Sequence, residues 1–341
     1  MKLSDVCTKG TSNIAQKDLD ARNGTYPIYG ASGFIKNVDF YHQEKPYIAI
    51  VKDGAGVGRV MQLPAKSSVI GTMQYIIPKE GVSVEYLAYA LEHMNLSKYY
   101  LGAAIPHIYF KDYCNESLPN HTPEEQARIS QILGVVCNLI SLRKQQLAKL
   151  DQLVKSRFIE MFGDPITNSK CLPTNNLGKV LLLKAGDFTA ASDIAADPTT
   201  ENIYPCYGGN GIRGYVAEYN QEGSYSLIGR QGALSGNVQY ATGKFKNTEH
   251  ALLVTPLIEM NSVWLNHLLI NLDLQRYQTG AAQPGLSVKN LQEIPIIEVP
   301  KEDQNQFADF VKQTDKSKLA IQQSLEQLEI LKKSLMQKYF G

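Results

Sequence analysis

The sequence repeats itself at a fixed separation, and this repeat constrains the fold of the chain more than any other feature. The sequence Tyr-Pro-Ile-Tyr-Gly at residues 26–30 returns as Tyr-Pro-Cys-Tyr-Gly at residues 204–208, a separation of 178 positions. Further pairs at the same separation are Gly54 and Gly232, Gly58 and Gly236, Leu150 and Leu328, and Phe162 and Phe340. One register kept over both halves predicts a tandem duplication, in which each copy is a globular part followed by a helix.

Length and composition fit this organisation. A chain of 341 residues suits two domains, each large enough to bury its own core. Hydrophobic residues make up 43% of the chain and charged residues 20%, which is typical of a folded protein. The 34 basic and 33 acidic side chains leave a net charge of +1, which excludes a uniformly basic surface. Any contact with a polyanion such as nucleic acid must therefore be local.

Short runs of β-branched and aromatic residues flanked by glycine predict strands in both copies. These runs are residues 47–51, 74–77 and 225–228. One helix is expected in each globular part, over residues 84–93 and 263–271. Each copy is therefore predicted to be an α+β domain in which sheet dominates.

A long amphipathic helix is predicted after each globular part. From Pro123 onward, apolar residues recur at strides of three and four over about forty residues, and Gly163-Asp164-Pro165 ends the pattern. A second such pattern opens at Pro300. At about 1.5 Å per residue, each helix reaches on the order of 60 Å. An apolar stripe this long and narrow requires another helix as its partner.

Each predicted helix is the available partner of the other. Because a globular part lies between them in the sequence, an antiparallel coiled coil with one globular part at each end is the economical arrangement. This arrangement makes the chain pseudo-two-fold symmetric. The alternative is that each helix lies on its own globular part.

The sequence shows neither a membrane segment nor a cysteine framework. No apolar run reaches the roughly 18 residues of a membrane helix, and the first residues lead into no signal-peptide segment, so a cytoplasmic location is expected. The five cysteines are odd in number, scattered, and never spaced as Cys-x-x-Cys. This pattern predicts neither a disulfide framework nor a structural zinc site.

The glycine-rich segment at residues 53–58 invites comparison with a phosphate-binding loop. Such a loop requires a helix directly after it, whereas the residues after Gly58 and after its duplicate Gly236 favour a strand. We therefore interpret both segments as turns between strands, in which glycine supplies positive φ.

Several enzymatic signatures are missing from the sequence. It lacks a Gly-x-Ser-x-Gly elbow, a Gly-x-x-x-x-Gly-Lys-Ser/Thr loop, the usual core of metal-dependent nucleases, and the Asn/Asp-Pro-Pro-Tyr/Phe loop of amino-methyltransferases. These absences favour a binding protein whose partners carry out the chemistry.

Two motifs carry a resemblance to a known family. The sequence Pro-Glu-Glu-Gln-Ala-Arg-Ile at residues 123–129 is close to the motif with which that family begins its conserved helix, and Tyr-Pro-x-Tyr-Gly-x-x-Gly occurs in both halves. Together with the duplicated order of globular part and helix, these motifs make the chain similar over essentially its whole length to the DNA-specificity subunit of Type I restriction-modification systems, commonly called HsdS.

The resemblance implies a division of the chain into four parts. They are a target recognition domain over residues 1–120, a central conserved helix over 121–164, a second target recognition domain over 165–299 and a C-terminal conserved helix over 300–341. Each recognition domain is expected to read one half of a bipartite DNA sequence. The helical pair is expected to fix the unread gap, since two modest sites held at a fixed distance gain affinity together.

The resemblance also implies the partners. They are double-stranded DNA, two methyltransferase subunits that dock on the helices, and the restriction subunits. This chain is then a non-catalytic subunit without cofactor or metal, and S-adenosylmethionine, ATP and Mg are expected in the partner subunits. No membrane contact is expected.

Comparison of the two copies sorts the candidate DNA contacts. Cations at equivalent positions in both copies are expected to bind phosphate, because phosphate contacts carry no base sequence. The phosphate candidates are the pairs Lys52 with Arg230 and Lys111 with Lys289, together with Lys244 and Lys246 in the second copy. The alternative for these residues is solvated surface charge.

Equivalent positions with different polar residues are candidates for base readout, since each copy would read its own bases. These positions pair Arg59 with Asn237, Asp53 with Gln231, His107 with Gly285, and Tyr109 with Ser287. An arginine binds guanine with two hydrogen bonds, and asparagine or glutamine binds adenine in the same way. The repeated tyrosines at positions 26, 29, 204 and 207 are interpreted as core residues rather than as base-stacking ones.

Two other functions stay open on the sequence alone. One is a stand-alone DNA-modifying enzyme, a methyltransferase or nuclease with an unrecognised site. The other is a duplicated protein-interaction scaffold that does not bind DNA. Salt dependence separates the scaffold from a phosphate-binding protein, whose affinity for duplex DNA falls steeply as salt is raised.

Overall fold

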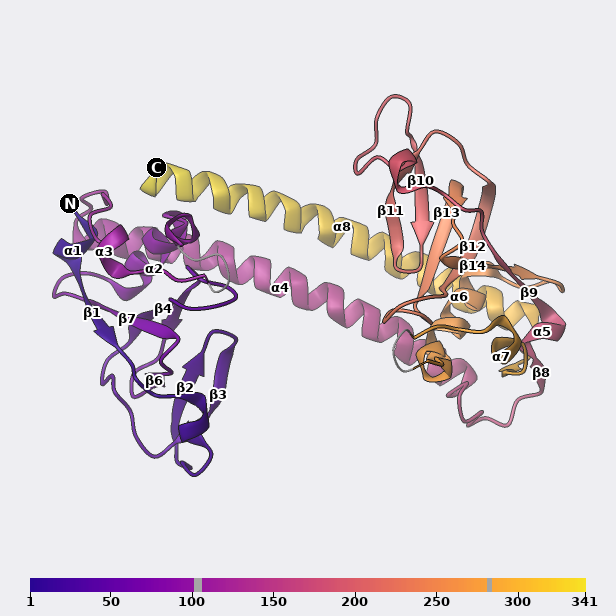
Figure 1. The fold of residues 1–341 in the computed structure, drawn as a ribbon, viewed down its shortest axis with the longest axis horizontal. Helices are drawn as coiled ribbons and strands as arrows, with labels where there is room; N and C mark the ends of the chain where they lie inside the picture. The colour runs from indigo at the N-terminus through magenta and orange to yellow at the C-terminus, as the bar shows by residue number, and fades with distance from the viewer. Residues whose placement is uncertain (101–105, 281–283) are drawn as a thin grey trace. The chain divides into compact units, whose positions relative to one another are not determined.

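The computed structural model describes residues 1–100, 106–280 and 284–341. The chain divides into two compact units, which we call unit 1 (residues 1–144 and 323–341) and unit 2 (residues 145–322). Each unit therefore combines one globular part with a portion of both long helices. Figure 1 labels the helices and strands of both globular parts.

The described residues of the globular part of unit 1 form two sheets. One has the strand order β1-β7-β4-β5 and the other the order β3-β2-β6. The strands are β1 (Cys7–Thr11), β2 (Tyr26–Gly30), β3 (Gly33–Val38), β4 (Tyr47–Val51), β5 (Val60–Leu63), β6 (Ser68–Val69) and β7 (Met73–Pro78). The helices are α1 (Leu3–Val6), η1 (Gln16–Leu19), α2 (Val84–His93), η2 (Leu96–Tyr99) and α3 (Phe110–Tyr113).

Strand β4 forms the centre of unit 1 because it is buried on both faces. Ile48 and Ile50 belong to the cluster that contains Leu87 of α2. Tyr47 and the other residues on the opposite face belong to the cluster that contains β2, β3 and β6. The alternation of side chains along a strand therefore joins two hydrophobic clusters through one strand.

The globular part of unit 2 has one larger sheet, with the strand order β11-β10-β13-β12-β14-β9, and a small sheet of β15 and β8. The strands are β8 (Thr174–Asn176), β9 (Leu181–Ala185), β10 (Tyr204–Gly208), β11 (Gly211–Val216), β12 (Gln221–Gly229), β13 (Val238–Asn247), β14 (Ala251–Pro256) and β15 (Pro295–Ile297). The helices are α5 (Leu177–Val180), η3 (Ala191–Asp193), α6 (Ser262–Asn271), η4 (Leu274–Tyr277) and α7 (Val288–Gln292).

A pair of prolines explains why the two globular parts differ in their sheets. In unit 2, Ser224 of β12 pairs with Thr242 of β13, and the ladder continues on both sides. The equivalent residues in unit 1 are Pro46 and Pro64. Proline has no backbone N–H to donate to a ladder, so prolines at both of these positions interrupt it. The strand equivalent to β13 is therefore divided into β5 and β6, and the sheet into two.

The two long helices have the bounds that their sequence signals predict. Helix α4 spans Pro123–Phe162 and α8 spans Lys301–Phe340. At the start of α4, Thr122 N donates to Glu125 Oε2 at 2.8 Å and Glu125 N donates to Thr122 Oγ1 at 3.3 Å. This reciprocal pair is a capping box.

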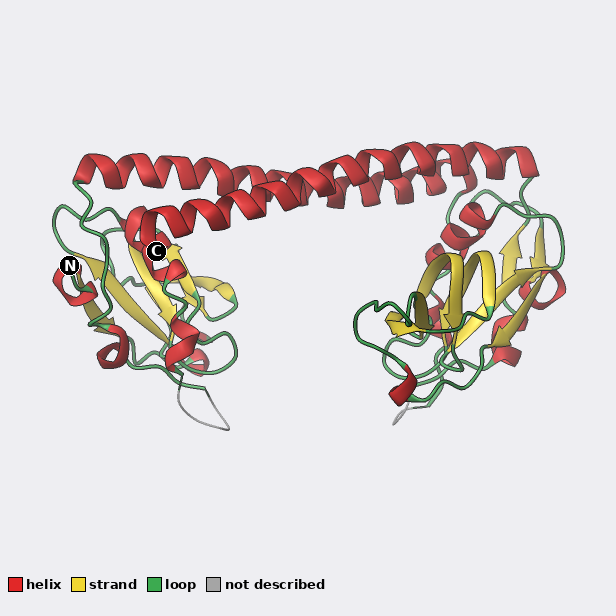
Figure 2. Cartoon of the chain, turned by 90° about the horizontal axis from the view of Figure 1, so that it is seen from above, coloured by secondary structure: helices red, strands yellow, loops and turns green. Residues whose placement is uncertain are grey.

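Within each unit, α4 and α8 pack against each other in opposite directions. In unit 1, Leu133 near the start of α4 clusters with Met336 near the end of α8. In unit 2, the ring of Phe158 near the end of α4 lies 5.4 Å from that of Phe307 near the start of α8. Figure 2 shows the two helices side by side in both units. The predicted antiparallel helix pair is confirmed, and so is the pair of tandem sheet-rich α+β parts.

Ion pairs connect the helices in both units. Lys144 Nζ lies 3.0 Å from Glu329 Oε1 in unit 1, and Lys318 Nζ lies 2.6 Å from Asp151 Oδ1 in unit 2. The structure differs from the sequence expectation in one respect, because the described residues include several short helices beside the one predicted in each globular part. A search of the described helices finds none with the length and apolar character needed to cross a bilayer.

Candidate nucleic-acid interface

In unit 1, the turn after β4 pairs with a second loop that is distant in the sequence. Gly54 N donates to Pro106 O at 2.9 Å, and Ile108 N donates to Lys52 O at 3.0 Å. Asp53 and His107 form the bridge between these two hydrogen bonds. The paired loops therefore place the candidates Lys52, Asp53 and His107 together.

Unit 2 repeats this arrangement at the equivalent residues. Gly232 N donates to Pro284 O at 2.8 Å, and Leu286 N donates to Arg230 O at 2.9 Å. Gln231 and Gly285 form the bridge between them. The backbone is therefore the same in both units, whereas the side chains that it carries differ.

The glycines of these turns have the role predicted for them. Gly58 and Gly236 have φ values of +85° and +92°. A Cβ on Gly58 would lie 2.6 Å from Ser97 N, and a Cβ on Gly236 would lie 2.6 Å from Gln275 N. Strand β5 follows the first turn and β13 the second. The interpretation as turns between strands, rather than phosphate-binding loops, is confirmed.

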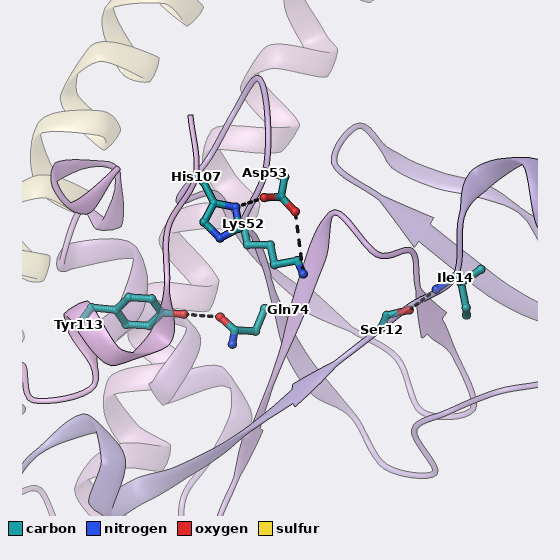
Figure 3. Close-up of polar contacts among 7 residues, drawn as sticks. All are labelled: Ser12, Ile14, Lys52, Asp53, Gln74, His107 and Tyr113. Atoms are coloured by element: carbon teal, nitrogen blue, oxygen red, sulfur yellow. Dashed lines mark hydrogen bonds and ion pairs between the residues drawn. The ribbon is translucent and has the colours of Figure 1, made fainter. Parts of the chain in front are cut away.

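The polar contacts of the first loop pair are drawn in Figure 3. Lys52 Nζ lies 3.9 Å from Asp53 Oδ2, and His107 donates through Nδ1 to the same carboxylate. The side chains of Lys52 and Asp53 are 23% and 30% exposed, respectively. Asp53 therefore neutralises part of the positive charge that Lys52 would offer to a phosphate.

Two more candidates of unit 1, Tyr109 and Lys111, lie at the start of helix α3 beside this pair. Tyr113 anchors the helix, since its hydroxyl donates to Gln74 Oε1 at 2.9 Å in the buried interior (Figure 3). Tyr109 stays 48% exposed, and its ring lies 4.1 Å from that of His107. Lys111 is exposed, with Nζ 5.3 Å from the centre of the Tyr109 ring. These side chains form one continuous polar and aromatic surface.

The equivalent surface of unit 2 has a different chemistry. Gln231 is exposed, and its Oε1 lies 3.2 Å from His250 Nδ1. Arg230 is partly exposed. Ser287 and Lys289 are both exposed at the start of α7, which takes the place of α3. This surface offers an amide, a hydroxyl and two cations where unit 1 offers a carboxylate, an imidazole, a phenol and two cations.

Arg59 and Asn237 connect these surfaces to a third segment that the sequence did not single out for DNA contact. Arg59 Nη1 donates to Ala31 O at 2.9 Å, at the tip of the β2–β3 hairpin. Asn237 Nδ2 donates to Asn210 Oδ1 at 3.1 Å, at the tip of the β10–β11 hairpin. The repeated Tyr-Pro-x-Tyr-Gly motif leads directly into these tips, so this repeat is the sequence signal from which they could have been found.

Lys244 and Lys246 lie apart from the turn at Arg230–Asn237. Both are on β13, whose register places Val238 at the turn end and Phe245 opposite Gln221 at the other end. Lys244 is exposed over the Tyr219 ring, and its hydrogen bond with Tyr219 raises its pKa. Lys246 Nζ lies 3.8 Å from Asp187 Oδ2 and lines a hollow of about 380 Å³. The structure therefore does not bring these two candidates together with the others of unit 2.

No group of three His, Cys, Asp or Glu side chains that is suited to a metal ion occurs in residues 1–100, 106–280 and 284–341. The interface candidates are instead hydrogen-bonding side chains and cations. Such side chains bind phosphates and base edges directly.

The chain is similar in sequence to known specificity subunits. It is 41% identical over 157 residues to the Type I restriction enzyme EcoprrI specificity subunit of Escherichia coli. This match covers 46% of this chain and 37% of the relative. It is 35% identical over 95 residues to a putative type I restriction enzyme specificity subunit of Haemophilus influenzae. This match covers 27% of this chain and 25% of the relative. The chain thus matches well under half the length of either relative.

The fold is also similar to that of solved structures. The S subunit of the Type I restriction-modification system of M. genitalium superposes with a TM-score of 0.68 at 18% identity, over 100% of this chain and 95% of that one. A chain from a structure of type I R-M complex assembly gives a TM-score of 0.56 at 15% identity, over 99% and 96%. The sequence profile of the Type I restriction modification DNA specificity domain matches residues 1–152 and 175–330. The chain therefore belongs to the Type I restriction modification DNA specificity domain family.

Proposed function

We propose that this chain is the DNA-specificity subunit of a Type I restriction-modification complex and reads a bipartite sequence in double-stranded DNA. The observation that carries the proposal is the loop pair that recurs in both units with the same hydrogen bonds and different side chains. A constant backbone that presents variable polar groups suits two readers of two different half-sites.

In this proposal, each globular part is a target recognition domain for one half-site. The first extends over residues 1–120 and the second over 165–299. The helices at 121–164 and 300–341 hold the two domains at a set spacing and provide the surface on which methyltransferase subunits dock. A rigid spacer adds specificity, since it rejects half-sites at the wrong separation.

The candidate contacts fall into two classes. The exposed cations Lys111 and Lys289, with the partly exposed pair Lys52 and Arg230, are assigned to phosphate. Lys244 and Lys246 would extend the phosphate contacts of the second domain. Base readout is assigned to Arg59, Asp53, His107 and Tyr109 in the first domain and to Asn237, Gln231 and Ser287 in the second. Arg59 suits guanine, and Asn237 and Gln231 suit adenine.

The chemistry of the complex is assigned to its partners. Methyltransferase subunits would bind S-adenosylmethionine, and restriction subunits would use ATP with Mg. This chain would contribute sequence recognition and no catalytic group. A cytoplasmic location follows from a role on chromosomal and incoming DNA.

The test is to co-express the chain with a Type I methyltransferase subunit from the same genome and to map the methylated bases across that genome. A two-part motif with a fixed gap is expected. Replacing residues 1–118 by those of another family member should change one half of the motif and leave the other half intact. A change in both halves, or in neither, would refute the assignment of one domain to one half-site.

A salt titration distinguishes this proposal from an interaction scaffold. The affinity of the complex for its DNA should fall steeply as salt rises, because cations that bind phosphate release counterions. If the complex does not bind DNA, or if its affinity for DNA does not change with salt, the interaction scaffold would be favoured.

A further inference from the structure

Both hairpin tips carry a large apolar side chain that is open to solvent, at equivalent positions. Phe34 is 60% exposed at the start of β3, and Ile212 is 52% exposed at the start of β11. Each follows a glycine with positive φ, Gly33 at +112° and Gly211 at +99°. The two tips therefore have the same backbone turn and the same chemical class of side chain.

A single exposed apolar residue is ordinary on a protein surface. These two differ because the tip on which each lies is fixed beside a candidate base-reading residue. In unit 1, the Arg59 guanidinium donates to Ala31 O, three residues before Phe34. In unit 2, Asn237 donates to Asn210, two residues before Ile212.

Backbone packing also fixes the tip in unit 2. A Cβ on Gly209 would lie 3.5 Å from Gly229 Cα and 3.7 Å from Arg230 N. The tip is therefore in contact with the end of β12, where the chain enters the turn at Arg230–Asn237. DNA that binds against Arg230 and Gln231 would therefore also lie against the hairpin tip.

We infer that the two hairpin tips enter the DNA groove together with Arg59 and Asn237, and that Phe34 and Ile212 contact the 5-methyl group of a thymine in their respective half-sites. This inference rests on the proposed function. The thymine methyl is the apolar feature of the major groove, and apolar side chains are the groups that distinguish it. The contact would also remove the exposed Phe34 and Ile212 side chains from water.

The test uses the full chain in complex with its methyltransferase subunits, after the half-sites have been mapped. Each thymine of the first half-site is replaced in turn by deoxyuridine, which lacks only the methyl group, and the dissociation constant is measured by fluorescence anisotropy. The unaltered chain should lose about fourfold in affinity at one position, as expected for one methyl group removed from an apolar contact.

The variants complete a double-mutant cycle. Phe34→Ala should bind the thymine duplex more weakly and should lose nothing further at that position with deoxyuridine, whereas Phe34→Leu should restore the preference for thymine. Ile212→Ala should behave in the same way in the second half-site only. Leu257→Ala is the matched control, since Leu257 is 57% exposed and lies just beyond β14, away from the hairpin tip. It should bind both duplexes as the unaltered chain does.

Three results would overturn the inference. They are independent losses from Phe34→Ala and deoxyuridine, a half-site without any A·T pair, and an effect of Phe34→Ala on assembly with the methyltransferase instead of on DNA. A failure of the proposed function looks different, because no methylated bipartite motif would then be found at all.

Discussion

At the residue scale, His267 shows how the duplication gave the same position two different environments. His267 lies on α6, and its ring packs edge-on against Phe307 of α8 at 5.3 Å. Its charged neighbours on α8 are Asp315 and Lys318. Burial lowers the pKa of His267 to about 4. The equivalent residue in unit 1 is Tyr89, whose side chain does not take up a proton in mild acid as a histidine does.

The lowered pKa of His267 predicts that the protein loses stability in mild acid. The unfolded chain takes up a proton near pH 6.5 and the folded chain only near pH 4, so stability falls as the pH drops through this window. The loss at pH 5 should be about 2 kcal/mol, measured as the change in the free energy of unfolding between pH 7 and pH 5. His267→Leu should remove most of this difference, and an unchanged pH dependence in that variant would contradict the assignment.

Arg59 is the residue whose replacement should change readout most in the first half-site. Arg59→Ala should cost about 1–3 kcal/mol in binding and should relax the preference at one base pair only, because one side chain reads one base. The mapped methylation motif and the dissociation constant check this. Arg22→Ala is the control, since Arg22 pairs with Asp39 just beyond the end of β3 opposite to the hairpin tip. An equal loss in both variants would count against base readout by Arg59.

At the element scale, a buried glutamine fastens the start of each long helix to its globular part. Gln126 Oε1 accepts from Ser83 N at 3.1 Å, and Gln126 Nε2 donates to His121 O at 3.0 Å. Gln304 makes the same contacts with Asn261 N and Val299 O, both at 2.8 Å. Ser83 and Asn261 cap α2 and α6, so each glutamine joins two helices.

Gln304→Leu should destabilise the protein by about 1–3 kcal/mol, because the two backbone groups that bind the amide lose their partners. The free energy of unfolding in urea measures this loss. Gln306→Leu is the matched control, since Gln306 is exposed two residues along the same helix, and its effect should stay within about 0.5 kcal/mol. Similar losses in both variants would mean that the two hydrogen bonds of the Gln304 amide contribute little to stability.

The bounds of the elements were predictable where a residue dictates the backbone locally. Pro123 and Gly163 delimit α4 because proline fits a first helical turn and glycine accepts the positive φ that ends a helix. The cause of the division of one strand into β5 and β6 is also visible in the sequence, as Pro46 and Pro64. It emerges only once the register of unit 2 shows that the equivalent residues, Ser224 and Thr242, face each other across a ladder.

The candidate interface was predictable only in part. The alignment of the two copies selected candidates from both loops of each pair, because it compares equivalent positions, but the pairing of the loops came from the structure. It did not identify the hairpin tips, since the hydrogen bonds from Arg59 and Asn237 cross between segments far apart in the sequence. Nor did it reveal that Asp53 and His107 bind each other, because a contact between side chains depends on their positions in the folded chain.

At the scale of the whole molecule, the proposed role of the helices as a spacer predicts a separable loss of gap discrimination. The division between the two units falls between Lys144 and Gln145 in α4 and between Gln322 and Gln323 in α8. A short Gly/Ser insert at both points replaces continuous helix by a flexible chain, whose end-to-end distance varies. Each recognition domain keeps its own loops and its own portion of both helices, so both half-sites should still be read.

Binding should become weaker and less selective for the gap at the same time. A flexible connection lowers the effective concentration of the second domain at its half-site, and it also lets that domain reach half-sites at other separations. The measurement is the affinity of the complex for a series of duplexes in which only the gap length changes. The unaltered chain should prefer one gap sharply, whereas the variant should bind several gaps with similar affinity. If the variant keeps the sharp preference, the spacing is set by the methyltransferase partners and not by the helices of this chain.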